Sequence, residues 1–175
     1  MKAVTQPSYL KSSDLQKLRD GRHDQPFEVL GPHRNLKKLW LTVYMPDTER
    51  LEALTEGGPV VLDRIDGDVF GGVISDGSYR LRAISGQGSS YEFDDPYRFG
   101  PVLGDIDLHL IGEGTHRRLW HALGAHVMVH EGAKGTHFAV WAPNARRVSV
   151  VGDFNAWDGR RNPMRRVGGS GVFRS

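Results

Sequence analysis

A short polar turn near the end of the sequence carries the residues best suited to chemistry. It covers residues 152–159 and contains Asp153, Asn155 and Trp157, which supply a carboxylate, an amide and a large aromatic ring. The flat apolar face of an exposed indole fits the C–H face of a sugar ring. Carboxylate and amide groups add acceptors and donors for hydroxyl groups. Two roles stay open for the ring: it faces outward as a binding platform, or it packs on residues 160–164 and closes the end of a β-sandwich.

Two short strands are predicted just before this turn, where they would hold it. Apolar Phe138, Val140 and Ala142 recur at every second position, and a β-branched run over residues 148–151 follows. Pro143-Asn144 separates the two runs. Period-two alternation bounded by Gly, Pro and Asn is typical of short antiparallel strands.

The same pattern occurs earlier in the chain. Residues 41–54 align with residues 138–151 at a constant separation of 97 positions, with Val, an aromatic residue, Pro and Arg at matching places. A second echo pairs Val69-Phe70 with Val172-Phe173 at a separation of 103. Such similarity indicates two copies of one supersecondary unit. The first copy has residues 55–58, Thr-Glu-Gly-Gly, in place of the aromatic turn, so we expect it to act as a spacer or packing domain.

These patterns predict an all-β chain of two tandem immunoglobulin-like β-sandwich modules, with a short N-terminal helix and a helical connector. Ser13 is expected to cap the helix and Gly21 to end it. The sequence ends where the first copy has only reached Phe70-Gly71, so the second module is expected to be truncated. The expected boundaries are residues 1–25 for the N-terminal arm and helix, 26–104 for the first module, 105–131 for the connector and 132–175 for the incomplete second module.

Other titratable residues suggest sites that their spacing does not support. His121, His126 and His130 have no Cys and no well-spaced carboxylate to complete four metal ligands. Asp94 and Asp95 are adjacent, so on a strand they point to opposite faces and cannot form an acid/base pair. We therefore predict no catalytic residue, no metal site and no cofactor in this sequence.

Composition and charge exclude several kinds of partner. Among 175 residues the formal net charge is only +2, too small to favour nucleic acid or an anionic membrane. The sequence has no Cys, which suits a reducing compartment. Residues 1–7 contain no apolar core of signal-peptide length, and no apolar run approaches the ~20 residues that span a bilayer. We expect a soluble cytoplasmic protein without a nucleic-acid or membrane partner.

Ordered blocks of sequence resemble one known family. They are residues 94–101 (DDPYRFGP), 113–116 (EGTH), 123–126 (LGAH) and 138–164, which read F-x-V-W-A-P-N-A-R-R-V-S-V-V-G-x-F-N-x-W-D-G-R-R-x-P-M. The last block is similar to the early-set carbohydrate-binding module of family 48 that precedes the catalytic barrel of glycogen branching enzymes. The resemblance covers nearly the whole chain and implies the N-terminal region of a bacterial 1,4-alpha-glucan branching enzyme of glycogen biosynthesis.

The resemblance also implies partners and roles. An alpha-glucan such as glycogen, amylose or a malto-oligosaccharide would stack on Trp157, with Asn155 and Asp153 beside it. Family members catalyse glucosyl transfer in a C-terminal glycoside hydrolase family 13 barrel, and none of its motifs occurs in residues 1–175, so the chain alone is expected to be inactive. The alternative is a non-enzymic immunoglobulin-like scaffold or interaction fragment without sugar binding of its own. Trp120 and Trp141 are expected in the core.

Overall fold

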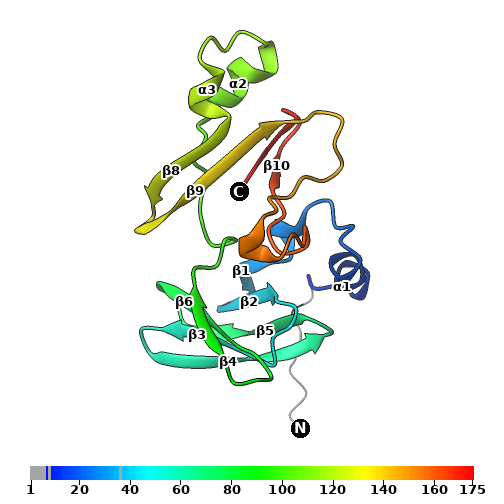
Figure 1. The fold of residues 1–175 in the computed structure, drawn as a ribbon, viewed down its shortest axis with the longest axis vertical. Helices are drawn as coiled ribbons and strands as arrows, with labels where there is room; N and C mark the ends of the chain where they lie inside the picture. Colours follow the sequence, from blue (N-terminus) through cyan, green and yellow to red (C-terminus); the bar gives the residue numbers. More distant parts are fainter. Residues whose placement is uncertain (1–6, 8, 36) are drawn as a thin grey trace. The chain divides into compact units, whose positions relative to one another are not determined.

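The computed structural model describes Pro7, residues 9–35 and residues 37–175, and it forms two compact units. The first is Met1–Arg98 and the second is Phe99–Ser175. Eleven strands and three short α-helices make up the described part of the chain, which confirms the all-β prediction (Figure 1). None of the helices in that part is long and apolar enough to cross a membrane.

In the first unit, α1 and the 3₁₀ helix η1 precede seven antiparallel strands in the order β1-β2-β5-β4-β3-β6-β7. The long strand β4 pairs with both β3 and β5 and carries a register shift between Arg64 and Asp66. Side chains from β2, β5, β3 and β6 meet in one buried core. The bounds are α1 (Ser12–Arg19), η1 (Pro26–Glu28), β1 (Gly31–Asn35), β2 (Lys38–Tyr44), β3 (Arg50–Thr55), β4 (Gly58–Asp66), β5 (Val69–Ile74), β6 (Tyr79–Ile84) and β7 (Ser90–Phe93).

Strand β6 shows why this sequence forms a sandwich. Leu81 and Ala83 are buried in the core, and the alternate residues Arg80 and Arg82 lie on the other face. There both guanidinium groups approach the Glu92 carboxylate of the neighbouring strand, at 3.3 and 2.8 Å. The period-two alternation visible in the sequence is therefore the division between core and surface.

Helix α1 packs on the opposite face of β2 and β5. Leu15 and Leu18 join Leu30, Tyr44 and Val69 in a second buried cluster. The predicted helix end is confirmed, because Gly21 has a left-handed φ of +64° and its N–H donates to the Leu18 carbonyl at 3.1 Å. The predicted start is wrong: Ser13 lies inside the helix, whose N-cap is Lys11 without any side-chain cap bond.

The second unit holds a four-stranded sheet in the order β10-β11-β9-β8. Figure 1 shows β8 and β9 as a long hairpin, with α2 and α3 beside the start of β8. One sheet face is covered where Ala139 and Val172 pack on Leu103, Ile111 and Ala122. The bounds are α2 (Asp105–Glu113), α3 (Leu119–Ala122), β8 (Gly124–His130), β9 (Ala133–Trp141), the 3₁₀ helix η2 (Asp153–Asn155), β10 (Arg165–Val167) and β11 (Val172–Arg174).

Two regions of this unit differ from the sequence-based expectation. Residues 105–131, expected as a connector, contain α2, α3 and a strand, β8, that pairs with β9 along its whole length. The strand predicted over residues 148–151 is wrong. That segment makes only an isolated bridge between Ser149 and Pro163, flanked by a bond from the Val150 N–H to the Asn162 carbonyl at 2.9 Å. The loop that follows it is held by backbone turns together with side-chain hydrogen bonds.

Asp95 makes the first unit sensitive to pH. Its fully buried carboxylate accepts from the Tyr79 hydroxyl at 2.6 Å and from the Tyr97 N–H at 2.9 Å, and burial raises the pKa of Asp95 to about 6. The carboxyl group therefore stabilises the unit most below its unfolded pKa near 3.8, and this stability is lost as the pH rises through 6. In the parent chain, we expect this titration to lower the unfolding free energy by roughly 2–3 kcal/mol between pH 4 and 7. Asp95→Asn should remove that fall.

The measurement is urea unfolding of the first unit, followed through its own NMR signals across that pH range. Asp94→Asn is the matched control, because the partly exposed Asp94 carboxylate pairs with Arg98 at 3.1 Å. Equal slopes for the parent and Asp95→Asn would show that Asp95 does not titrate in this range.

Candidate functional site

The turn singled out in the sequence is a compact loop that follows the Ser149–Pro163 bridge. Its first half is the single 3₁₀ turn η2. The Gly152 carbonyl accepts from the N–H groups of Asn155 at 3.1 Å and Trp157 at 3.0 Å, so the backbone folds back on itself within six residues. Trp157 therefore lies at the end of a hydrogen-bonded turn.

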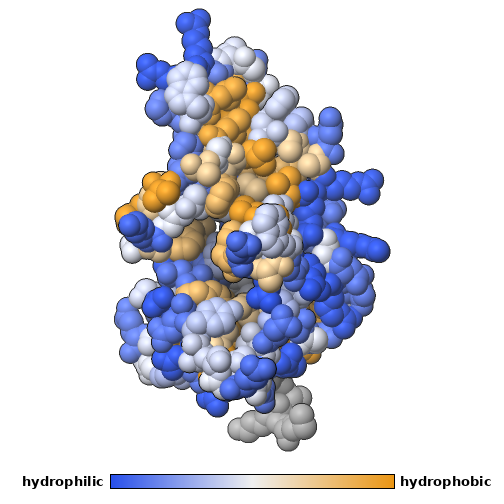
Figure 2. Space-filling view, in the orientation of Figure 1, coloured by the Kyte–Doolittle hydropathy of each residue, from blue (hydrophilic) through white to orange (hydrophobic). Residues whose placement is uncertain are grey.

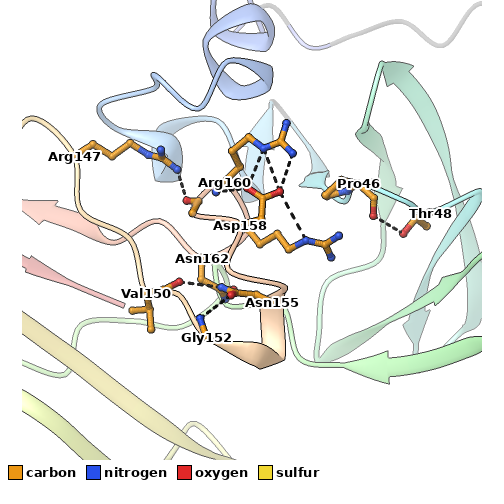
Figure 3. Close-up of polar contacts among 11 residues, drawn as sticks. Pro46, Thr48, Arg147, Val150, Gly152, Asn155, Asp158, Arg160 and Asn162 are labelled. Atoms are coloured by element: carbon orange, nitrogen blue, oxygen red, sulfur yellow. Dashed lines mark hydrogen bonds and ion pairs between the residues drawn. The ribbon is translucent and has the colours of Figure 1, made fainter.

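Asn155 is the internal support of this loop. Its side chain is 5% exposed, and its Oδ1 accepts from the Gly152 N–H at 3.0 Å (Figure 3). Its Nδ2 donates to the Val150 carbonyl at 2.9 Å and to Asn162 Oδ1 at 2.8 Å. The amide group thus ties both sides of the loop together, and each of its polar atoms is used internally.

Trp157 is displayed on the outside of the loop. Its side chain is 66% exposed, and its Nε1–H donates to Asp153 Oδ1 at 2.9 Å. Ala156 and Trp157 both have left-handed backbones, with φ of +53° and +58°. This region is uncommon for a bulky residue and costs free energy that the surrounding bonds must offset. The indole is thus held by its backbone turn at one end and by a carboxylate at the other.

Phe154 is a second exposed ring on the same turn, and it was not among the predicted site residues. Its side chain is 69% exposed, three positions before Trp157. The signal for it was present, since two large aromatics on one polar turn are hard to bury together. The loop therefore presents two aromatic side chains with the exposed Asp153 carboxylate next to them.

Charged groups hold the far side of the loop. Both carboxylate oxygens of Asp158 accept from Arg160, at 2.8 to 3.1 Å, and the Arg147 guanidinium donates to the Gly159 carbonyl (Figure 3). The hydrogen bond from Arg160 is the main cause that holds the pKa of Asp158 below its usual value. Asp158 thus stays ionised at neutral pH and anchors the loop beyond the aromatic turn.

The predicted site residues are brought together, with different surroundings. Asp153 and Trp157 are exposed and in contact, and Asn155 lies buried beneath them. The prediction that Trp120 and Trp141 belong to the core is wrong, because their side chains are 65% and 55% exposed. Over the described part of the chain, no group of three or more His, Asp or Glu side chains is placed to hold a metal ion.

Each of the two units contains a region that matches a known family model. Residues 11–97 match the family model described as "alpha-1,4-glucan branching enzyme GlgB, N-terminal domain". Residues 122–175 match "Carbohydrate-binding module 48 (Isoamylase N-terminal domain)". The chain belongs to the GlgB family of 1,4-alpha-glucan branching enzymes. It corresponds to their N-terminal region.

The curated relatives are similar along nearly the whole chain but are much longer. The 1,4-alpha-glucan branching enzyme GlgB of Roseobacter denitrificans is 49% identical over 172 residues, which is 94% of this chain and 23% of the relative. The corresponding enzymes of Rhodopseudomonas palustris and Bradyrhizobium diazoefficiens are 51% and 53% identical over 158 residues, 88% of this chain and 22% of each relative. The chain therefore spans under a quarter of the length of these GlgB proteins.

The buried amide of Asn155 gives a test of how the loop is held. Asn155→Ala leaves the Gly152 N–H, the Val150 carbonyl and Asn162 without their partner, at roughly 1–3 kcal/mol of local stability. We expect hydrogen exchange at the amides of Gly152 and Trp157 to become about 5- to 160-fold faster. Asn162→Ala removes only one of these bonds and should have a smaller effect. Unchanged exchange in Asn155→Ala would show that the backbone turn stands without the amide.

Proposed function

We propose that this chain binds alpha-glucan through the aromatic loop of its second unit and helps to position the glucan for a branching enzyme. The single observation that carries the proposal is the exposed indole of Trp157, fixed by its bond to Asp153. A ring held in place loses little conformational entropy on binding, so more of the stacking energy appears as affinity. The match of this unit to carbohydrate-binding module 48 supports the same ligand class.

Each residue of the loop has a distinct part in this proposal. Trp157 offers the flat face for a glucose ring, and Phe154 extends the apolar surface. The Asp153 carboxylate orients the indole with one lone pair and keeps others for glucan hydroxyls. Asn155 positions the loop from below and contacts no sugar, since its amide bonds are internal.

Glycogen affinity electrophoresis of residues 1–175 tests this function. We expect glycogen to retard the parent chain and the Trp157→Ala variant to lose most of that retardation. One stacked ring contributes ~0.5–1.5 kcal/mol, so the dissociation constant should rise about 2- to 13-fold. Trp120→Ala is the matched control, because Trp120 is an equally exposed indole of the same unit outside the loop.

The control variant should migrate like the parent chain. If glycogen retards parent and Trp157→Ala alike, Trp157 is not the platform. If neither is retarded, the alternative function is favoured, in which the units act as an immunoglobulin-like scaffold for packing. One observation fits that alternative: Val127 and Val129 of β8 are exposed, and Figure 2 shows apolar surface over the region of the β8–β9 hairpin.

A further inference from the structure

The two units begin with the same helix and turn, at a separation of 93 positions. Leu15, Leu18 and Gly21 of the first unit correspond to Leu108, Ile111 and Gly114 of the second. Gly21 and Gly114 both have left-handed backbones, and their N–H groups donate to the Leu18 and Ile111 carbonyls, each at 3.1 Å. The correspondence is therefore one of structure as well as sequence.

A histidine after each helix repeats as well. His23 Nε2 lies 3.7 Å from Asp14 Oδ1, and His116 Nε2 lies 3.1 Å from Asp107 Oδ1. The other ring nitrogen accepts a backbone N–H two residues on, at 3.2 Å in both units. Both pairs keep the separation of 93 positions.

The following helical turn and strand keep the same spacing. The N–H of Leu30 donates to the Pro26 carbonyl and that of Leu123 to the Leu119 carbonyl, both at 2.7 Å. Each leucine starts a Leu-Gly-x-His segment that leads into β1 or β8. In the sheets, Gly31 pairs with Thr42, and Gly124 pairs with Ala139.

In the first unit, Tyr97 completes the cluster that this segment builds. Its ring lies 4.6 Å from that of Phe27, between centroids, and it is buried with Tyr44 and Leu30. A Cβ on Gly31 would come within 2.7 Å of Tyr97 Cβ and 3.1 Å of its carbonyl oxygen. The backbone of Tyr97 thus packs directly against the sheet at Gly31.

In the second unit, the residues at the corresponding positions are exposed to solvent. Phe27 corresponds to Trp120, Tyr44 to Trp141 and Gly31 to Gly124. Both indoles are mostly exposed. A Cβ on Gly124 would meet only the His126 ring, at 3.8 Å, and Gly124 itself is exposed. Nothing in the second unit takes the place that Tyr97 fills in the first.

We propose that Trp120, Gly124 and Trp141 form a docking site for an Asp-Pro-Tyr peptide turn of the kind formed by residues 95–97. The group that packs against Gly31 is the backbone and side chain of a tyrosine. The matching site at Gly124 therefore fits a peptide better than a sugar. The relatives are roughly four times as long as the matched region, and the occupant is a turn from that further length. The docked tyrosine covers both indoles and completes the second cluster as Tyr97 completes the first.

The test adds residues 93–100 to the full chain as a tethered copy. Arg174 pairs with Ala139, which pairs with Gly124, so Ser175 lies about two strand spacings, ~10 Å, from the site. A flexible linker of about six Gly and Ser residues spans ~13 Å and gives a millimolar effective concentration. The readout is NMR of the backbone amide of Gly124 and the four indole N–H groups.

We expect the tethered copy to shift the signals of Gly124, Trp120 and Trp141 and to leave those of Trp40 and Trp157 unchanged. Tyr97→Ala in the tethered copy should abolish the shifts, and Trp120→Ala in the chain should weaken docking. Trp157→Ala should leave docking intact, which separates this site from the proposed glucan platform.

Three results would overturn the proposal. The first is unchanged Gly124, Trp120 and Trp141 signals in the tethered chain. The second is equal shifts from the Tyr97→Ala copy, which show contact without recognition of the tyrosine. The third is a shift of the same signals by maltoheptaose, or by raising the concentration of the untethered chain. These mark the surface as a sugar site or as a contact between copies.

Discussion

A three-stranded pairing in one fixed register underlies both units. Strand β2 lies between β1 and β5, and β9 lies between β8 and β11. Tyr44 pairs with Val69 in the first unit, as Trp141 pairs with Val172 in the second. A slip by one residue would turn every side chain to the other face. The register thus decides which residues meet the preceding helix.

The same register decides which positions beside the central strand are covered and which are left exposed. It places Gly31 and Gly124 at the same point beside the central strand, one buried under Tyr97 and the other exposed. It also sets where the chain leaves β9 for the aromatic loop. The two units share their supporting strands, and they differ in what has been added at the edges of those strands.

Within the loop, one buried amide supports an exposed ring. The left-handed backbones of Ala156 and Trp157 cost roughly 1–3 kcal/mol each, and they persist because the surrounding bonds hold them. Asn155 contributes three of those bonds. The sequence-based interpretation placed Asn155 beside the sugar. The geometry instead gives Asn155 a positioning role inside the loop, and it leaves Asp153 exposed beside the indole.

Much of the fold was predictable, and the part that was not has a physical reason. The separation between matched residues is 93 before the first hairpin, 97 after it and 103 at β5 and β11. Strand β8 has seven residues where β1 has five, and β9 has nine where β2 has seven, which accounts for the change of four. A comparison at one constant separation finds only the middle of the repeat, and it therefore assigns α2 and β8 to a connector.

The candidate site was predictable only as a set of residues. Trp157 on a polar turn was visible in the sequence, but its alternatives, exposed platform or sandwich plug, could not be separated there. Whether the ring is exposed or buried depends on the hydrogen bond from Trp157 to Asp153 and on the hydrogen bond from Asn155 to Asn162. Both are side-chain contacts within an irregular loop, which no periodic pattern encodes.

The exposed ring of Trp157 lies where the second unit has an irregular loop in place of a regular hairpin. In the first unit, β3 and β4 pair over five residues and are joined by the tight turn at Glu56-Gly57. At the same place in the second unit only the Ser149–Pro163 bridge remains. Backbone turns and side-chain hydrogen bonds hold this irregular loop, and they keep Trp157 in a left-handed backbone with its indole exposed.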